Sequence, residues 1–249
     1  MARVNATNRI KVRTIAAMMK LNGTTDYVDL GALGAVAAGT AAFTVSCYFM
    51  RDRLTGLTAM LGDANNAAQN HFNFQVNGPG RKLLSTLITT VGAKALVGLA
   101  NIPMFQHCHG ILTYDGATIT FYYNGNFDNS TTHTGTILAS TSGMQIGSGS
   151  APVGGLLRFF GSRIGEMRYW TRALSATEAH DLVYDNRLDA AMLTGLAGEW
   201  LLVSNANDTS GGGNNGTIVG ATFDSVNVPL TDRVPTTRTA STDSRGPIT

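Results

Sequence analysis

The chain has 249 residues, including 29 Gly and 6 Pro, and its formal charge is +2 with 14% of residues charged. A chain of this length can bury a stable apolar core without disulfides, and its net charge is too small to favour a nucleic-acid partner. Abundant Gly, Thr, Ser and Asn favour short strands joined by tight turns over a helical bundle, and the apolar content is too high for a disordered chain.

The two cysteines and the apolar runs bear on redox state and on membranes. Cys47 and Cys108 lie in apolar stretches without Cys-x-x-Cys spacing, which favours buried free thiols, with one disulfide as the alternative. No stretch approaches the ~20 apolar residues of a membrane helix. Residues 1–20 carry scattered basic groups and no continuous apolar centre. We therefore expect neither a membrane partner nor a signal peptide.

Polar extensions flank the apolar part of the chain. Residues 1–14 form a basic N-terminal arm, and residues 228–249 form an extended polar tail with few large apolar side chains. Such segments are typically solvated or dock on a neighbouring protein, and nucleic-acid binding is the less favoured interpretation for the arm. A single domain is therefore expected over residues 15–227.

Strands are expected in the first half wherever β-branched and aromatic residues gather between turn signals. The expected ranges are 14–21, 43–49, 57–62, 71–76 and two strands within 83–99. Phe72, Phe74 and Val76 alternate with polar residues, so one face of their strand should be exposed to water.

The second half combines strand patterns with one helix signal. Strands are expected over 107–114, 117–123, 137–147 and 161–170, with turns at Asp115-Gly116 and Asn124-Gly125 and a polar loop over 148–155. Ser175 is a suitable N-cap, and Glu178 lies three residues later, as in a capping box. A helix is therefore expected over 176–184, either extended or followed by a second short piece within 189–196.

Three phrases resemble the laminin G-like, concanavalin A-like jelly-roll domains. GSRIGEMRYWTRALSATE (161–178) is similar to their closing signature, although Gly165 stands where the family usually has Asp; TDYVDLG (25–31) and YDGATITFYYNG (114–125) match two further motifs. The resemblance implies an all-β fold. More specifically, it implies a concanavalin A-like two-sheet antiparallel jelly-roll sandwich with one short helix after the closing strand.

The segment from Trp200 to Ile218 resembles a phrase that commonly opens such a domain, yet here it follows the closing signature. Two explanations are open. The segment completes the sandwich of its own chain, because permutation costs little when terminal strands lie side by side, or it is donated to a neighbouring subunit. We favour completion of the chain's own domain.

Catalysis is not expected. Hydrolases of this superfamily that retain configuration need paired carboxylates, and the three glutamates, Glu166, Glu178 and Glu199, lack a partner two or four residues away on a strand. Glu178 is explained by the helix cap. His107 and His109 share one face of a strand but lack a third ligand nearby, so a polar face is favoured over a metal site.

Calcium is the one candidate ion. Laminin G-like domains often bind it at the sandwich rim, and a hard cation prefers oxygen ligands. The candidate carboxylates lie in turns and loops: Asp26, Asp29, Asp115 and Asp128. Turn formation explains each of them equally well.

Two functions fit these observations. The first is a non-enzymatic virion structural protein of a phage-like virus, assembled in the host cytoplasm: a decoration, fibre or attachment module that docks on other virion proteins or on copies of itself through the arm and tail. Host glycan is a candidate ligand. The alternative is a bacterial surface carbohydrate-binding or adhesion module. An exposed aromatic platform would bind the glycan, with Tyr122, Tyr123 and Trp170 as candidates and core packing as the other role for each.

Overall fold

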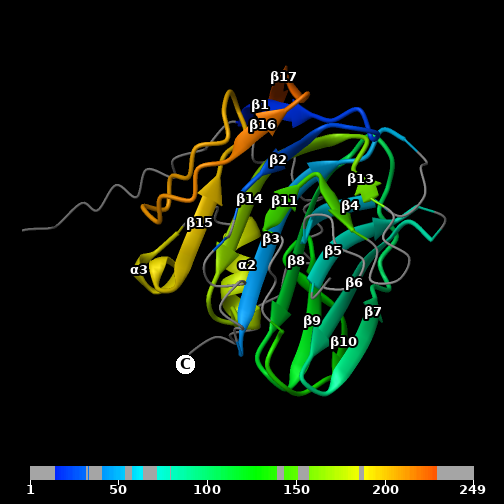
Figure 1. The fold of residues 1–249 in the computed structure, drawn as a ribbon, viewed down its shortest axis with the longest axis vertical. Coiled ribbons are helices and arrows are strands. Elements are labelled where there is room, and N and C mark those ends of the chain that lie inside the picture. Colours follow the sequence, from blue (N-terminus) through cyan, green and yellow to red (C-terminus); the bar gives the residue numbers. More distant parts are fainter. Residues whose placement is uncertain are drawn as a thin grey trace, which may run out of the picture.

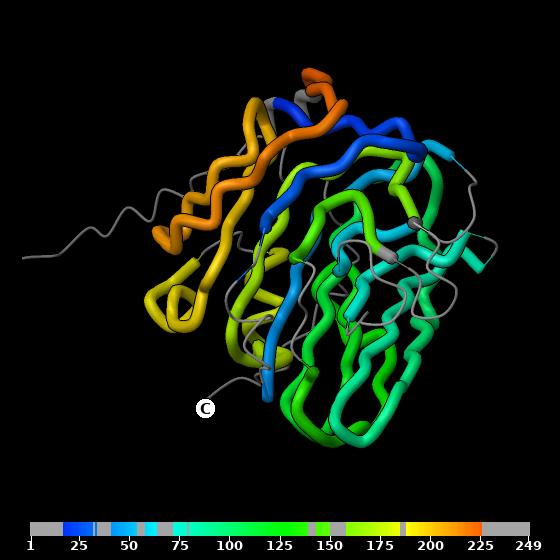
Figure 2. Tube along the Cα trace, in the orientation of Figure 1, coloured from blue at the N-terminus to red at the C-terminus, as the bar shows by residue number. Residues whose placement is uncertain are grey.

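The computed structural model describes residues 15–31, 33, 41–53, 58–63, 72–78, 80–138, 143–150, 157–184 and 188–228. These residues form two sheets that face each other, with two short helices beside one of them (Figures 1 and 2). The expected all-β, concanavalin A-like two-sheet sandwich is confirmed.

The first sheet contains eight strands. In spatial order they are β10 (Asn126–Thr132), β9 (Thr118–Tyr123), β8 (His107–Tyr114), β3 (Phe43–Met50), β14 (Arg163–Trp170), β1 (Ile15–Lys20) and β17 (Thr222–Val228), and β15 (Leu196–Trp200) also pairs with β14. The closing strand β14 therefore lies in the middle of this sheet. β10 was not expected from the sequence.

The second sheet is built around β4 and β5. Its main path is β16 (Thr217–Val219), β2 (Tyr27–Asp29), β11 (Met144–Ile146), β4 (Thr58–Asp63), β5 (Phe72–Asn77), β6 (Lys82–Thr89) and β7 (Gly92–Val97). The strands β12 (Ser148–Ser150) and β13 (Leu157–Phe159) pair with each other, and β13 joins β4 through Phe159 and Ala59. The two strands expected within 83–99 are confirmed as β6 and β7. Of the strand expected over 137–147, the structure forms β11 and an isolated bridge at Ile137, and residues 139–142 lie outside the described part.

Apolar side chains from both sheets fill the space between them and form the main core. A second, smaller core lies on the outer face of the first sheet, where α2 (Ala176–Tyr184) packs. Its members are Ile111, Tyr122, Trp170, Leu174, Ala179, Leu182, Val183 and Met192, the last from α3 (Ala190–Leu193). The first sheet is thus apolar on both faces where α2 covers it.

One face of β5 was expected to be exposed to water, and that expectation is wrong. The outward-facing Asn73 and Gln75 have 1% and 0% of their surface exposed. The β12–β13 hairpin lies against this face, and Arg158 Nη1 donates a hydrogen bond of 2.8 Å to Gln75 Oε1. The expected polar loop over 148–155 therefore begins as strand β12, which packs on a sheet far from it in sequence.

The segment from Trp200 to Ile218 completes the sandwich of its own chain. β15 pairs with β14, and β16 pairs with β2. Trp200 is fully buried in the main core, and its indole nitrogen donates a hydrogen bond of 2.8 Å to the carbonyl of Asn214. The swapped arrangement is therefore not needed to bury this segment.

The described domain runs from Ile15 to Val228, two residues that pair with each other across β1 and β17. The arm at 1–14 and nearly all of the expected tail lie outside the described residues. Within the described part, Cys47 and Cys108 are free, buried thiols. None of the described helices combines the length and apolar character that a membrane crossing requires.

Candidate functional site

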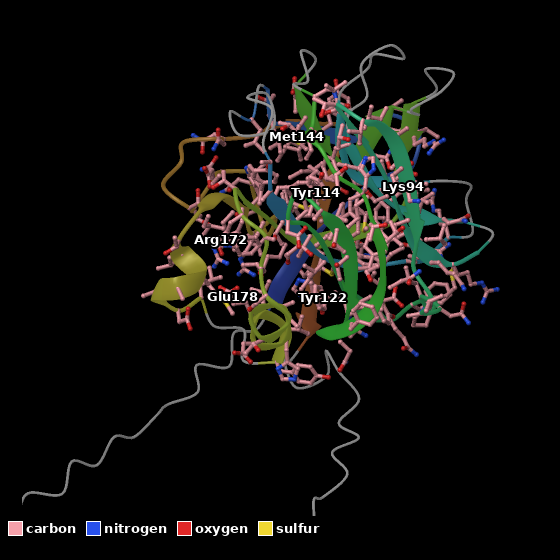
Figure 3. All side chains as sticks on the ribbon, turned by 90° about the horizontal axis from the view of Figure 1, so that it is seen from below. Lys94, Tyr114, Tyr122, Met144, Arg172 and Glu178 are labelled. Atoms are coloured by element: carbon pink, nitrogen blue, oxygen red, sulfur yellow. The ribbon has the colours of Figure 1, made fainter. Side chains whose placement is uncertain are left out.

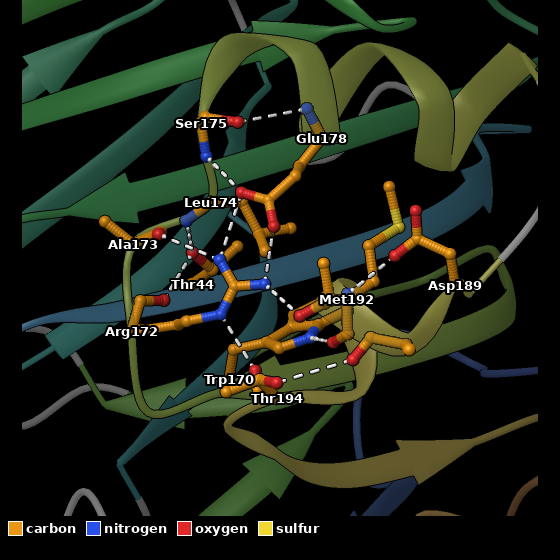
Figure 4. Close-up of polar contacts among 12 residues, drawn as sticks. Thr44, Trp170, Arg172, Ala173, Leu174, Ser175, Glu178, Asp189, Met192 and Thr194 are labelled. Carbon is orange, nitrogen blue, oxygen red and sulfur yellow. Dashed lines mark hydrogen bonds and ion pairs between the residues drawn. The ribbon is translucent and has the colours of Figure 1, made fainter.

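The turn from β14 into α2 is held by Arg172, as Figure 4 shows. Its guanidinium donates to both carboxylate oxygens of Glu178, at 2.6 and 3.0 Å, and to the carbonyls of Thr194 and Ala191, both at 2.8 Å. One side chain thus links the start of α2 to both ends of α3. In Figure 3, Arg172 and Glu178 lie beside the helices, and Tyr122 lies on the neighbouring sheet.

The capping box expected at α2 is confirmed. The backbone N–H of Ser175 donates to Glu178 Oε2 at 2.8 Å, and the N–H of Glu178 donates to Ser175 Oγ at 3.2 Å. The hydrogen bonds from Arg172 are the main cause that lowers the pKa of Glu178. These contacts fix α2 on the sheet, so this turn supports a nearby surface and has a structural role of its own.

Exposed aromatic rings gather where the far end of α2 meets the β9–β10 hairpin. Phe127 and Tyr184 have 64% and 42% of their surface exposed. The rings of His180 and Tyr184, one helical turn apart, stack at 4.2 Å with an angle of 18°. Asn126 Nδ2 lies 3.3 Å from the Tyr184 hydroxyl, which joins hairpin to helix. We call Asn126, Phe127, His180 and Tyr184 the aromatic surface.

Buried residues fix the geometry of this surface from below. Phe127 packs edge to face on Tyr122, with ring centroids 6.5 Å apart at 82°. Gly125 lies so close to Tyr184 that a Cβ atom there would be 2.8 Å from Cε2. The hairpin and α2 are therefore in tight contact, and the exposed rings are held by packed neighbours.

The residues expected to bind glycan occupy three different places. Tyr122 lies under the aromatic surface with 8% of its surface exposed, and burial raises its pKa. Trp170 is fully buried in the small core and donates a hydrogen bond to the carbonyl of Met192 at 2.7 Å. Tyr123 packs against the main core on the opposite face of the sheet, with its hydroxyl 3.1 Å from Cys108 Sγ. Trp170 and Tyr123 are therefore not an exposed platform, because apolar packing on both faces of the sheet takes up their rings.

The sequence contains a signal for the aromatic surface that the choice of Tyr122, Tyr123 and Trp170 does not use. Phe127 stands among polar residues directly after the Asn124-Gly125 turn, and Tyr184 is the last residue of α2. An aromatic residue in a hairpin tip is more exposed than one within a strand flanked by neighbours. Their meeting depends on how α2 crosses the sheet, which the sequence pattern does not specify.

The four candidate calcium residues each stabilise a separate piece of backbone. Their carboxylates accept hydrogen bonds as follows: Asp26 from Asn22 N, Asp29 from Gly31 N, Asp115 from Ala117 N and Thr118 N, and Asp128 from Leu99 N and Ala100 N. Across the described ranges, no three His, Cys, Asp or Glu residues come together in a way that could hold a metal ion. The structure therefore supports the turn-forming role of these aspartates.

Two glutamates that are far apart in sequence meet on the outer face of the first sheet. Arg168, with 1% of its side chain exposed, forms ion pairs with Glu166 and with Glu199, the latter at 2.8 Å. The pairing of β14 with β15 brings Glu199 opposite Arg168. Because the guanidinium lies between these carboxylates and pairs with both, the arrangement differs from the acid and nucleophile pair of a retaining glycosidase.

The histidines of β8 also have polar and aromatic partners. His109 Nε2 lies 2.6 Å from Ser46 Oγ, and the His107 ring stacks on Tyr48 with centroids 5.5 Å apart. Among the described residues neither belongs to a group that could hold a metal. The expected polar face on this strand is confirmed, although it is buried at His109.

Comparison with known proteins gives the family. A family model described as the concanavalin A-like lectin/glucanases superfamily matches residues 22–180. The chain belongs to this superfamily. No curated protein sequence matches the chain.

Solved structures share the fold at low sequence identity. A Bacteroides ovatus protein, provisionally described as carbohydrate binding, aligns with a TM-score of 0.67 and 17% sequence identity. The alignment covers 87% of this chain and 62% of the Bacteroides protein. The heptameric SAP-like pentraxin of Limulus polyphemus aligns with a TM-score of 0.58 and 15% sequence identity, and the alignment covers 85% of this chain and 96% of the pentraxin. The CBM40 domain of the Ruminococcus gnavus IT-sialidase, bound to α2,3-sialyllactose, aligns with a TM-score of 0.53 and 13% sequence identity. This alignment covers 68% of this chain and 99% of that domain. These similarities establish a common fold.

Proposed function

We propose that this superfamily member is a non-enzymatic glycan-binding module and that the aromatic surface binds the sugar. The exposure of Phe127 and of Tyr184, on the hairpin and the helix that Asn126 joins, carries the proposal. Large exposed aromatic side chains that are held by packed neighbours are typical of interaction sites, since their apolar faces remain in water until a ligand covers them. A sugar ring presents a flat face of C–H groups that can stack on such rings.

Polar groups at the rim of the aromatic surface suit the hydroxyl groups of a sugar. Asn126 reaches the Tyr184 hydroxyl, and the His180 imidazole lies 3.2 Å from the Asp181 carboxylate, with about half of each side chain exposed. A few polar groups around an apolar face are the usual composition of a small-ligand site. The support from Arg172 and the capping box keeps α2 in place, which reduces the ordering cost of binding.

Two further observations support binding over catalysis. The Bacteroides ovatus and Ruminococcus gnavus structures, which share the fold, are described by their carbohydrate binding. Each of the three glutamates has an arginine partner: Glu166 and Glu199 pair with Arg168, and Glu178 pairs with Arg172. A surface module that attaches its carrier to glycans is therefore the function we favour, as in a bacterial carbohydrate-binding or adhesion protein.

A virion attachment or decoration module is the second candidate, and one observation favours it. Ile15 pairs with Val228, so the two points at which the basic arm and the polar tail join the sandwich are adjacent. Two extensions that start together suit docking on a neighbouring subunit. Light scattering on the full chain and on residues 15–228 tests this role. We expect the full chain to self-associate and the shorter chain to be monomeric, and two monomers would count against self-docking.

A glycan array probed with the full chain tests the main proposal. We expect saturable binding to a defined set of glycans, and calorimetry with one of them should then give a measurable affinity. Binding to none of the glycans, with the chain folded by circular dichroism, would contradict the proposal.

A further inference from the structure

A buried arginine lies at the end of β3. Arg51 follows the strand directly and has 3% of its surface exposed. Its Nη2 makes a hydrogen bond of 3.4 Å to the carbonyl of Arg53, and its Nη1 is buried without a hydrogen-bond partner. A guanidinium that is removed from water in this way is costly unless it is paired.

The neighbouring acids are engaged elsewhere. Asp52 accepts hydrogen bonds from Arg163 Nη1 at 2.7 Å and from Ser162 Oγ at 2.9 Å. Asp128 holds the backbone N–H groups of Leu99 and Ala100, and its second carboxylate oxygen is buried without a partner. Within the part of the chain that the structure describes, no carboxylate forms an ion pair with Arg51.

A second arginine, Arg81, adds to the excess of positive charge at Arg51. The positive charge of Arg81, after burial, helps to lower the pKa of Arg51, and only the Cys108 thiol opposes this effect. Arg81 lies in the turn between β5 and β6, is exposed, and has a positive φ of 50°. Arg51 thus follows a strand of the first sheet, and Arg81 precedes a strand of the second.

The loop between β7 and β8 joins these two arginines. The N–H of Ile102 donates to the carbonyl of Arg81 at 2.7 Å, and the N–H of Phe105 donates to the carbonyl of Arg51 at 2.6 Å. Phe105 has a φ of 58° and is 69% exposed. A bulky residue rarely adopts this left-handed conformation, and strained backbone of this kind is concentrated at binding sites.

We propose that Arg51 and Arg81 form a binding site for a small oxoanion or carboxylate, at the end of the sandwich where the loop 98–106 joins the two sheets. The anion supplies the negative charge that Arg51 lacks, and a guanidinium binds such groups through two parallel hydrogen bonds. Phe105, whose N–H binds the Arg51 carbonyl, is an exposed apolar side chain of the same loop. The site uses other residues than the aromatic surface, and it goes beyond the proposed glycan function.

Thermal unfolding of the full chain with low millimolar sodium sulfate or sodium acetate, at constant ionic strength set with sodium chloride, tests this site. A ligand that binds the folded state alone raises the melting temperature saturably, by roughly 4 °C near saturation for a domain of this size. A rise with either anion supports the site; the larger response shows whether the natural ligand is an inorganic oxoanion or a carboxylate. No saturable rise with both anions overturns the proposal.

Three variants make the assignment specific. Arg51→Met should abolish the response and should raise the melting temperature in anion-free buffer, because an unpaired buried charge has been removed. Arg81→Met changes an exposed side chain that does not threaten folding, and it should weaken the apparent affinity roughly tenfold. The control Arg53→Met, at an arginine with 54% of its side chain exposed, should respond as the wild type does. An unchanged response in both Arg51→Met and Arg81→Met overturns the proposal, and if Arg51→Met does not fold, Arg81→Met decides alone.

Discussion

Arg172 and Glu178 form a bidentate ion pair across the turn that leads into α2, with Nη2 2.6 Å from Oε1 and Nη1 3.0 Å from Oε2. The same carboxylate caps the helix through the N–H of Ser175. Six residues of sequence thus connect the central strand of the first sheet to the helix that carries half of the aromatic surface.

Glu178→Gln keeps an oxygen for the cap and removes the charge. We expect a loss of about 1 kcal/mol of unfolding free energy at pH 7, since both side chains are partly exposed to solvent. The pKa of Glu178 is lowered in the folded state, so its contribution is present above the unfolded value of ~4.3 and disappears as the pH falls through the folded value. Urea unfolding at pH 7 and at pH 3 should therefore show a smaller difference between variant and wild type at the lower pH. Asp181→Asn, at an exposed carboxylate of the same helix, is the control, and an equal loss in both variants would refute the assignment.

Gly165→Ala should destabilise the domain. A Cβ atom at this position would lie 2.8 Å from Tyr48 Cδ1 and 3.1 Å from Met18 Cε, both on fully buried side chains. Overpacking of this kind typically costs about 1–3 kcal/mol, and Gly165→Asp should cost more because it also buries a carboxylate. Chemical denaturation measures both. Wild-type stability in Gly165→Ala would mean that the side chains of Tyr48 and Met18 shift to make room for the added Cβ without a loss of stability.

The same position shows what the sequence could and could not reveal. The motif around Gly165 predicted the closing strand, the turn and the helix, because strand alternation, capping and turn signals are local. The departure from the usual Asp could be read from the sequence, but its cause could not, since Met18 and Tyr48 reach this point from two other strands.

Other differences have the same origin. The alternation in β5 correctly placed Phe72 and Phe74 in the core, whereas the burial of Gln75 depends on Arg158, which lies 83 residues away. Similarly, Asn126 and Tyr184 are 58 residues apart. Of the three aromatic candidates, Tyr122 packs on Phe127, and the exposed rings could be identified only from the packing of α2.

Arg163 ties the last strand to the sandwich. It donates to Asp224 at 2.7 and 3.0 Å and to Asp52 at 2.7 Å, and its side chain is 18% exposed. In a double-mutant cycle, Arg163→Met and Asp224→Asn should each destabilise the domain by about 1–2 kcal/mol, with a coupling energy of at least about 0.5 kcal/mol. Hydrogen exchange should show faster opening of β17 in both variants. Strictly additive effects would mean that the ion pair does not hold this strand.

Trp200→Ala tests whether the last segment belongs to its own chain. Trp200 is fully buried in the main core, so its truncation should cost about 3–5 kcal/mol. Because the contacts lie within one chain, the unfolding midpoint of residues 15–228, which lack the arm and the tail, should not depend on protein concentration. A midpoint that rises with concentration would favour exchange of this segment between subunits.

The most direct test of the glycan-binding proposal is calorimetry of Phe127→Ala with the glycan that binds the wild type best. The control is Val91→Ala, since Val91 and Phe127 are exposed to almost the same extent, 63% and 64%, and Val91 lies in the turn between β6 and β7. We expect Phe127→Ala to weaken binding roughly tenfold, as the loss of one stacked ring implies, and Val91→Ala to bind like the wild type. Wild-type affinity in Phe127→Ala would contradict the assignment of the aromatic surface.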